Sequence, residues 1–178
     1  GNIYCFRGNA EKALLLYQHA LSLADQAHNL HLGGTLYNDV GGLYRRQGNY
    51  PQALAYYNRS LQIANHLGNE ESLAVGLGNV GIVYKNQGKF DQAIQAYQQS
   101  LRYSLKHGND RLTANQYGNL GALYGLQGRY AEAIEMHQKS LQINLRIGNQ
   151  HGEADTYGNL GIVYTGLGNL PAAMEMLQ

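Results

Sequence analysis

Residues 117–141 read YGNLGALYGLQGRYAEAIEMHQKSL, and residues 80–101 follow the same pattern 40 positions earlier as VGIVYKNQGKFDQAIQAYQQSL. The period extends along the whole chain, because glycine recurs every 40 residues and tyrosine keeps its phase: Gly8, Gly48, Gly88, Gly128 and Gly168, with Tyr44, Tyr84, Tyr124 and Tyr164. Self-similarity at a fixed period of this size is the signature of a repeat array. The sequence therefore predicts a chain of repeated supersecondary units.

Each unit contains two segments with helical spacing. In residues 109–148 the first segment places small and apolar residues three and four positions apart: Ala114, Tyr117, Leu120, Gly121 and Tyr124. Gly128 interrupts this segment, and a second one begins near Ala133 and stops at Gly148. Glycine can adopt the left-handed conformation that ends a helix, and the asparagine that follows favours a turn. We predict an all-α fold of helix pairs joined by Gly-Asn turns.

Four glycines interrupt the interior of the first helices, where glycine costs about 1 kcal/mol relative to alanine. They occupy equivalent positions of successive repeats: Gly41, Gly81, Gly121 and Gly161. A penalty of this size, repeated in phase, predicts that another helix approaches closely at that point.

The phase of the repeats also divides the chain. Residues 29–68, 69–108 and 109–148 form three full repeats, and residues 1–28 and 149–178 form partial ones. Gly1 and Tyr4 match Gly161 and Tyr164, so residues 1–8 correspond to the end of a first helix. Neither end resembles the polar cap that usually finishes a solenoid. We interpret residues 1–178 as a single array that is a fragment of a longer protein, and its uncapped ends as surfaces for self-association.

Composition excludes several classes of function. The net charge of +1 provides no field that would attract nucleic acid or an acidic membrane surface. The one cysteine excludes a disulfide framework and a cysteine-rich metal site, and it is compatible with the cytoplasm, where we expect the protein. No apolar run approaches the roughly 18 residues of a membrane span. We expect no cofactor and no metal.

Two local motifs have simpler explanations than chemistry. Gly76, Gly78 and Gly81 match a dinucleotide-binding pattern, but no strand precedes them and the repeat accounts for their spacing. His28 and His31 could share a metal, yet no cysteine or paired carboxylate accompanies them. No histidine belongs to a recognisable nucleophile motif, so we predict that the segment is not an enzyme.

The two quoted stretches resemble tetratricopeptide repeats. Both place Leu-Gly or Val-Gly, tyrosine, glycine, alanine, an aromatic residue and serine in the order of that motif. The 40-residue length and the Gly-Asn junctions resemble the Leu-Gly-Asn repeats of Pins-type signalling scaffolds and the repeats of kinesin light chains. The resemblance implies a right-handed superhelical solenoid of antiparallel helix pairs, whose first helices line a concave groove that binds a peptide or a helix of a partner.

Carried over to this sequence, the resemblance places ligand-binding asparagines just before the Leu-Gly or Val-Gly pair, at Asn79, Asn119 and Asn159. A carboxamide both donates and accepts hydrogen bonds, so it can satisfy the backbone of a bound peptide. The first full repeat departs from the pattern, because Asn38 and Asp39 stand where the others have glycine and asparagine. Asn115 and Asp155 lie one turn away on the same face. An alternative is that the asparagines only join neighbouring helices.

Basic residues follow the tyrosines of the first two full repeats: Arg45, Arg46 and Lys85. Later repeats have uncharged residues there, so we predict a more basic N-terminal part of the groove that favours an acidic ligand. The alternative is that these side chains only solvate helix ends. The periodic tyrosines are interpreted as packing residues.

The sequence thus predicts a protein-interaction module whose groove holds a segment of a partner protein, without nucleic acid or membrane. The alternative is a regulatory or oligomerisation arm of a larger multidomain protein, which could be catalytic. In the first case the groove holds a peptide from another chain, and in the second it holds part of its own chain.

Overall fold

The computed structural model describes the backbone of residues 2–176 and the side chains of residues 12–176. Over this range the chain is all-helical, and its nine helices are α1 (Asn2–Gln26), α2 (Leu30–Arg46), α3 (Tyr50–His66), α4 (Glu70–Asn86), α5 (Phe90–Lys106), α6 (Asp110–Leu126), α7 (Tyr130–Ile147), α8 (Gln150–Gly166) and α9 (Leu170–Glu175). None of the helices in the described part is both long and apolar enough to span a bilayer. The helices form two compact units, residues 1–88 (unit 1) and 89–178 (unit 2), which are described separately.

The predicted turns from Gly48 onward are present and share one geometry. Seven glycines with positive φ follow helices α2 to α8: Gly48, Gly68, Gly88, Gly108, Gly128, Gly148 and Gly168. Where the next residue is asparagine, its side-chain oxygen accepts a hydrogen bond from the backbone N–H three residues on, as at Asn49, Asn69, Asn109, Asn149 and Asn169. Asn29, which follows His28, caps α2 in the same way. Each Gly-Asn pair therefore ends one helix and caps the next.

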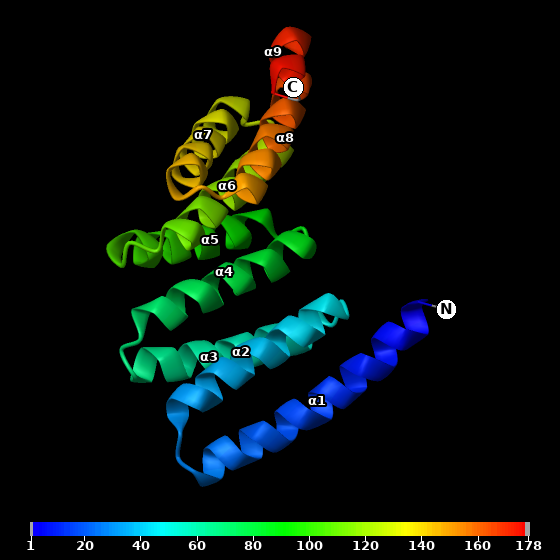
Figure 1. The fold of residues 1–178 in the computed structure, drawn as a ribbon, viewed down its shortest axis with the longest axis vertical. Coiled ribbons are helices and arrows are strands. Elements are labelled where there is room, and N and C mark those ends of the chain that lie inside the picture. Colours follow the sequence, from blue (N-terminus) through cyan, green and yellow to red (C-terminus); the bar gives the residue numbers. More distant parts are fainter. Residues whose placement is uncertain (1, 177–178) are drawn as a thin grey trace. The chain divides into compact units, whose positions relative to one another are not determined.

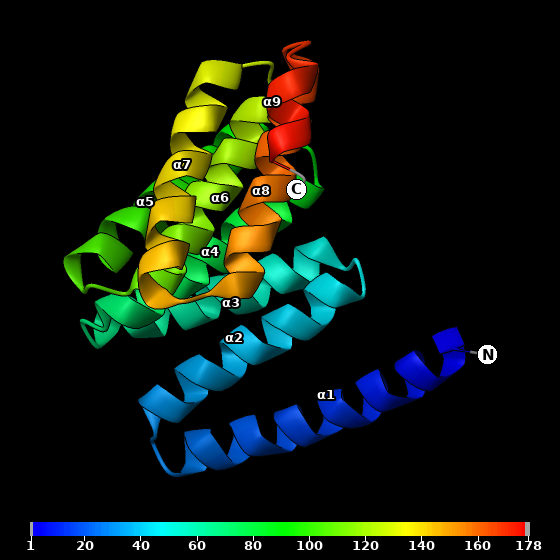
Figure 2. The ribbon, with the colours of Figure 1, turned by 45° about the horizontal axis from the view of Figure 1, so that its top comes forward.

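Unit 1 consists of α1 to α4. Helix α2 contacts α1, α3 and α4, and α3 also contacts α4. Figures 1 and 2 show α2 between α1 and α3. The core of unit 1 includes Leu21 and Ala24 of α1 and Leu36 and Val40 of α2. Helix α2 therefore packs against both neighbouring second helices, as a first helix of an array must.

Unit 2 consists of α5 to α9. Helix α6 packs on α5, α7 and α8, while α8 also packs on α7 and α9. Figure 2 shows α6, α7 and α8 side by side. Leu120 and Leu123 of α6 and Leu160 and Val163 of α8 are buried residues of this unit.

The glycines inside the first helices mark close contacts, as the sequence predicts. A Cβ at Gly41 would lie 2.7 Å from the ring of Tyr57, and one at Gly121 would lie 2.8 Å from the ring of His137. Tyr57 and His137 hold equivalent positions in α3 and α7, and their exposed fractions are 1% and 0%. The missing side chain of glycine lets a ring from the second helix lie directly against the first.

Helix α1 differs from the prediction at one boundary. The phase of the repeat predicts a turn after Gly8, whereas α1 runs unbroken from Asn2 to Gln26. Glycine permits the conformation that ends a helix, but it also tolerates the helical one. Continuing through Gly8 keeps the backbone hydrogen bonds at the cost of about 1 kcal/mol for glycine in a helix.

The periodic tyrosines pack as expected, though not equally. Tyr124 is buried, while Tyr44, Tyr84 and Tyr164 are half-buried. Tyr44 stacks on Tyr56 with ring centroids 5.3 Å apart, and Tyr37 lies 6.0 Å from Tyr56. Burial raises the pKa of the Tyr56 hydroxyl, and the neighbouring tyrosines raise it further.

Candidate protein-binding site

The ten residues predicted to line a groove all lie on first helices. Asn38, Asp39, Arg45 and Arg46 belong to α2, Asn79 and Lys85 to α4, Asn115 and Asn119 to α6, and Asp155 and Asn159 to α8. In unit 1 helices α2 and α4 contact each other directly, and in unit 2 the same holds for α6 and α8. Each unit therefore has a face formed by two neighbouring first helices, here called the first-helix face of that unit.

On the first-helix face of unit 1, the structure brings two predicted residues together. The Asn79 Nδ2 donates a hydrogen bond to the Asn38 Oδ1 at 2.9 Å, which joins α4 to α2. Both side chains are half-buried. A primary amide has two N–H donors and a carbonyl acceptor. Asn79 therefore has the helix-joining role of the structural alternative, and the bond uses only one of its two N–H donors.

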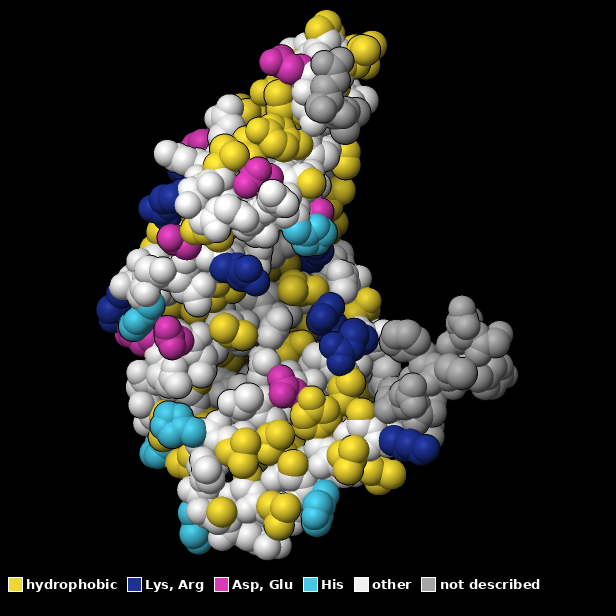
Figure 3. Space-filling model, viewed as in Figure 1, with side chains coloured by type: hydrophobic (Ala, Val, Ile, Leu, Met, Phe, Trp, Pro, Cys, Tyr) yellow, Lys and Arg dark blue, Asp and Glu magenta, His cyan; other side chains and the backbone are white. Residues whose placement is uncertain are grey.

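At the C-terminal end of α2, two arginines act on one hydroxyl. Arg45 hydrogen-bonds the buried Tyr57 hydroxyl. A Cβ at Gly42 would lie 3.7 Å from the Tyr57 Oη and 4.0 Å from the Arg46 Nη1. Figure 3 shows the dark-blue side chains gathered over this end of α2. A side chain at position 42 would therefore contact both the Tyr57 hydroxyl and the Arg46 guanidinium, and glycine leaves that space open.

The charge around Tyr57 is uneven. Burial raises the pKa of the Tyr57 hydroxyl, and the hydrogen bond and charge of Arg45 oppose that rise, as does the charge of Arg46. Asp39 is the carboxylate that acts on the same hydroxyl. Among the described side chains, the charged groups that act on this hydroxyl are therefore two guanidinium groups and one carboxylate.

The first-helix face of unit 2 has a different character. Asn119 and Asn159 are half-buried, and Asn115 and Asp155 are exposed. The Asp155 carboxylate lies 3.6 Å from the His151 Nε2, four residues earlier on α8. At the position equivalent to Gly42, α8 carries Ile162, whose side chain is 72% exposed. At this position α8 of unit 2 therefore exposes an aliphatic side chain where α2 of unit 1 has glycine.

Buried serines fix the helix pairs that present these faces. The Ser60 Oγ donates to the backbone oxygen of Gly34 at 2.8 Å, and the Ser140 Oγ donates to that of Ala114 at 2.9 Å. Both bonds join a second helix to the first helix of the same repeat, 26 residues earlier. The sequence signal was the serine that recurs before a leucine in each repeat, but its partner is not visible in the sequence.

Unit 2 extends this link into a polar network. The Asn144 Nδ2 lies 3.4 Å from the Ser140 Oγ and 3.5 Å from the Thr156 Oγ1. The Asn144 Oδ1 accepts from the Asn149 Nδ2 at 2.8 Å. A Cβ at Gly152 would lie 2.5 Å from the same oxygen, so glycine is required beside this network. Asn149 therefore caps α8 and also satisfies a buried amide.

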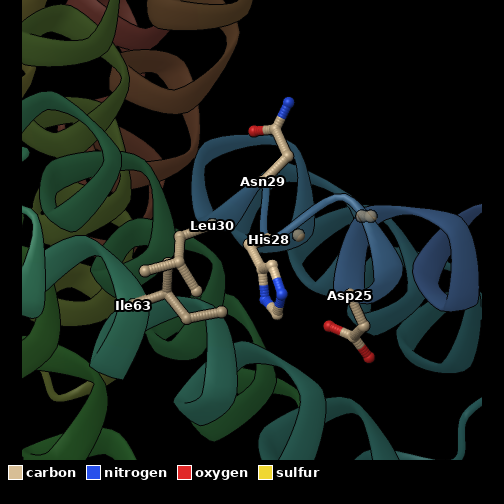
Figure 4. A pocket seen from close by; sticks show the side chains of 7 residues that line it. Asp25, His28, Asn29, Leu30 and Ile63 are labelled. Atoms are coloured by element: carbon tan, nitrogen blue, oxygen red, sulfur yellow. The ribbon is translucent and has the colours of Figure 1, made fainter.

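One pocket lies away from the predicted residues. It has a volume of about 250 Å³ and is formed where α1 ends and α2 begins, against α3. Figure 4 shows the His28 ring between Asp25 on one side and Leu30 and Ile63 on the other. Ligand pockets usually enclose about 300 Å³ or more. In its size and lining we find no sign of a small-molecule site.

The buried environment of His137 was not predictable from the sequence. Its side chain is fully buried, and neither ring nitrogen has a hydrogen-bond partner. Burial lowers the pKa of His137 to about 4, so the ring is neutral at pH 7. Among the described residues no three histidine, cysteine, aspartate or glutamate side chains gather in a way that could hold a metal ion.

The family model described as tetratricopeptide repeat matches residues 1–64, 31–106 and 112–178. The chain belongs to the tetratricopeptide repeat family. The resemblance seen in the sequence is therefore confirmed, as is the all-helical solenoid class of the fold. No curated protein matches the chain in sequence.

Solved structures show the same fold. BtubC (BKLC) from P. vanneervenii is 27% identical with a TM-score of 0.87, over 96% of this chain and 71% of that one. A signal transduction ATPase with numerous domains and a tetratricopeptide repeat sensor, from Pyrococcus horikoshii, is 22% identical with a TM-score of 0.82, over 98% of this chain but only 27% of that one. A putative kinesin light chain with nearly identical repeats, from Podosopora anserina, is 16% identical with a TM-score of 0.75, over 99% and 87%.

Proposed function

We propose that this chain is a non-catalytic protein-interaction module that holds a segment of a partner protein against its first-helix faces. Family membership supports an interaction role in general. The observation that carries the proposal is the Asn38–Asn79 pair. Its hydrogen bond orients both amides, which retain N–H donors at Asn38 and Asn79 and a carbonyl acceptor at Asn79. A peptide backbone needs such a donor and acceptor.

In unit 2, Asn119 and Asn159 would act in the same way toward the next part of the ligand. Asn115 and Asp155 are exposed one turn away and would contact its side chains. Hydrogen bonds at a solvated face are offset by the entropy of ordering the peptide, so we expect a micromolar dissociation constant, about −8 kcal/mol. A cytoplasmic location of the protein stays a prediction.

A second candidate is a regulatory arm of a larger protein. It is favoured by the similarity to a signal transduction ATPase in which tetratricopeptide repeats form a sensor. In that case the segment on the first-helix faces would come from the same polypeptide. Self-association through helix surfaces at the ends of the array is a third candidate.

The test compares two triple variants as baits in a lysate of the source cells. The first, Asn79→Ala/Asn119→Ala/Asn159→Ala, removes the amides of the first-helix faces. The second, Asn58→Ala/Gln99→Ala/Gln138→Ala, removes exposed amides of second helices as a matched control. Thermal melts establish that both variants are folded.

The proposal expects one partner to be retained by the parent and the control and lost by the first variant, and a synthetic peptide from that partner to compete. Retention by all three baits would place binding elsewhere on the chain. If no partner is retained by the parent while the longer protein shows protection of α2 and α4 in hydrogen exchange, the regulatory arm is the better account.

A further inference from the structure

The pocket where α1, α2 and α3 meet exists because the first full repeat lacks a side chain that later repeats have. Gly33 lines this pocket, and a Cβ at that position would meet no atom within 4 Å. In unit 2 the residue at the equivalent position, Thr113, is buried and hydrogen-bonds the Ser104 Oγ at 3.0 Å. Ser104 is in turn equivalent to Ala24, which also lines the pocket. The two side chains that meet in unit 2 are therefore reduced to a glycine and an alanine in unit 1, which leaves the pocket open.

His28 is a second departure from the repeat at the same place. Its φ of 51° lies in the left-handed region, where the equivalent residues of the following turns are all glycine: Gly68, Gly108 and Gly148. A residue other than glycine is strained there, and strain of this kind clusters at positions whose side chain has a function. The His28 ring forms a wall of the pocket, between Asp25 on one side and the aliphatic side chains of Leu30 and Ile63 on the other (Figure 4).

The lining of the pocket combines aliphatic surface with one acidic group. Leu30 and Ile63 contribute the aliphatic surface, and the described residues of the lining include the Asp25 carboxylate but no lysine or arginine. Asp25 is exposed and has no ion-pair partner among the described residues. Arg59, one turn before Ile63 on α3, donates to the Gln62 Oε1 and does not line the pocket. A ligand with an aliphatic stem and a cationic head matches both parts of this lining.

The volume of about 250 Å³ suits a single side chain. A cavity of about 150 Å³ holds one benzene ring, whereas pockets for free ligands usually enclose about 300 Å³ or more. Arginine and lysine both carry a cationic head on an aliphatic stem. The guanidinium of arginine is also planar, so it stacks on aromatic rings and binds a carboxylate through two N–H groups. Since His28 provides a ring and Asp25 a carboxylate, the lining favours arginine.

The pocket lies on a different side of α2 from the Asn38–Asn79 pair. Gly33 and Asn38 are five residues apart in this helix. That separation corresponds to about 140° around an axis with 3.6 residues per turn. A side chain in the pocket therefore belongs to another segment of the partner than the one held at the amides.

We propose that the pocket formed by Asp25, His28, Leu30, Gly33 and Ile63 binds an arginine side chain of the partner protein. The guanidinium pairs with the Asp25 carboxylate and stacks on the His28 ring. The aliphatic stem lies against Leu30 and Ile63, in the space that Gly33 leaves open. This inference rests on the proposed function, because the arginine comes from a partner protein, and it adds a second contact of stated chemistry.

The experiment titrates the whole isotopically labelled chain with small probes and follows the backbone amides of Asn29 and Gly33 by NMR. The probe n-butylguanidinium copies the stem and the head of arginine. Its uncharged analogue n-butylurea keeps the shape without the charge, and guanidinium keeps the head without the stem. In n-butylammonium the planar head is replaced by that of lysine.

Substitutions separate the parts of the site. Gly33→Leu fills the pocket with the residue found at the equivalent position 73, and Gly33→Ala fills part of it. Asp25→Asn removes the carboxylate, and Glu71→Gln, at an exposed position of α4, is its matched control. His28→Gly removes the ring. Thermal melts of all variants distinguish loss of binding from loss of folding.

We expect the parent to bind n-butylguanidinium with a dissociation constant of about 1 mM. Binding of n-butylurea should be about fivefold weaker because the ion pair is lost, that of guanidinium about tenfold weaker because the stem is lost, and that of n-butylammonium intermediate. Asp25→Asn should weaken n-butylguanidinium about fivefold and leave n-butylurea unchanged, while Glu71→Gln changes neither. Gly33→Leu should weaken both butyl probes about tenfold or more, and Gly33→Ala less. His28→Gly should weaken n-butylguanidinium without destabilising the fold.

Equal binding of n-butylguanidinium and n-butylurea by the parent would overturn the inference, because the pocket would then not select a cation. Tighter binding of n-butylammonium would overturn the choice of arginine, and equal loss in Asp25→Asn and Glu71→Gln would overturn the role of the carboxylate. Undiminished binding by a folded Gly33→Leu variant would place the probes elsewhere. If that variant does not fold, undiminished binding by both Gly33→Ala and His28→Gly has the same meaning. Since the probes need no partner, these outcomes leave the proposed function intact when the asparagine triple variant still loses the captured partner.

Discussion

The two units are built from the same helix pair but use their basic residues differently. In unit 2, Lys139 and Arg146 contact the carboxylates of Glu135 and Asp110 at 2.6 Å, and Arg129 pairs with Glu132 in the same way. In unit 1, Arg45 instead bonds the Tyr57 hydroxyl, and the charge of Arg46 also acts on that hydroxyl. Exposed ion pairs add little stability. The comparison indicates that Arg129, Lys139 and Arg146 of unit 2 have carboxylate partners, whereas Arg45 of unit 1 has a tyrosine hydroxyl.

A second difference concerns one buried position. Gly41 of α2 packs against Tyr57, and Gly121 of α6 packs against His137. The tyrosine hydroxyl has a partner in Arg45, whereas both nitrogens of the histidine have none. The ring that packs against the glycine thus has a hydrogen-bonded polar group in unit 1, the Tyr57 hydroxyl. In unit 2 the nitrogens of the corresponding His137 ring have no partner.

The largest expected effect follows from His137. Its pKa is about 4 in the folded chain and about 6.5 when unfolded, so the unfolded chain binds the proton more readily. Stability from this residue is complete above pH 6.5 and is lost as the pH falls from 6.5 to 4. The loss corresponds to about 3 kcal/mol. Urea unfolding of the parent and of His137→Tyr at about pH 7 and about pH 4.5 measures it.

The tyrosine variant copies the residue at positions 57 and 97 and should be less sensitive to pH by about the same amount. His66→Gln, at an exposed histidine of unit 1, is the control and should keep the pH dependence of the parent. If the parent and His137→Tyr lose equal stability between these pH values, His137 is not the source of the difference between the units.

The next effect tests the close contact itself. Gly41→Ala and Gly121→Ala place a methyl group under 3 Å from a buried ring. Overpacking of this kind costs about 1–3 kcal/mol and is partly offset by the helix propensity of alanine. We expect each variant to lose about 2 kcal/mol in urea unfolding.

Matched controls exist in the first helices of the same two units. A Cβ at Gly33 of α2 or Gly158 of α8 meets no atom within 4 Å. Gly33→Ala and Gly158→Ala should therefore gain up to about 1 kcal/mol. Equal effects at all four glycines would show that the rings do not constrain the helices.

A smaller effect distinguishes the caps of the two units. Asn49→Ala removes one cap bond and should cost about 1 kcal/mol. Asn149→Ala removes a cap bond and also leaves the buried Asn144 Oδ1 without its donor, so it should cost about 1 kcal/mol more. Thermal unfolding of both variants measures the difference, which should vanish in the background of Asn144→Ala.

The smallest expected effect is a gain. His28 has a φ of 51°, at the position where later turns have glycine. A side chain in the left-handed region costs about 1–2 kcal/mol, and glycine recovers part of this after the entropy of the unfolded chain is counted. We expect His28→Gly to stabilise unit 1 by about 0.5 kcal/mol in urea unfolding. A loss would mean that the His28 side chain contributes contacts that outweigh the strain.

Much of the fold could be predicted because each repeat carries its own signals. The Gly-Asn junctions placed the turns, and the phase of Gly41 and Gly121 predicted the close contact of helices. The prediction of a turn at Gly8 was wrong, because a glycine allows a helix to end but does not require it. The outcome there depends on what packs against the preceding residues, which the local sequence does not state.

The site was predictable only as a set of positions. The sequence placed all ten candidate residues on first helices. It could not show that Asn79 bonds Asn38, because the two are 41 residues apart and the partner departs from the repeat. It also could not show that Arg45 meets Tyr57 or that His137 has no partner, since both depend on side-chain positions between helices. Whether the ten residues bind a ligand stays a prediction.

The most direct test is chemical-shift mapping of the whole isotopically labelled chain with a synthetic peptide from the captured partner. Our account predicts the largest shifts at the Asn38 and Asn79 side-chain amides, with further shifts at those of Asn119 and Asn159. The second-helix surfaces of α3, α5 and α7 should be unaffected. Shifts centred on those second helices, or confined to the ends of the chain, would contradict the assignment of the first-helix face as the binding surface.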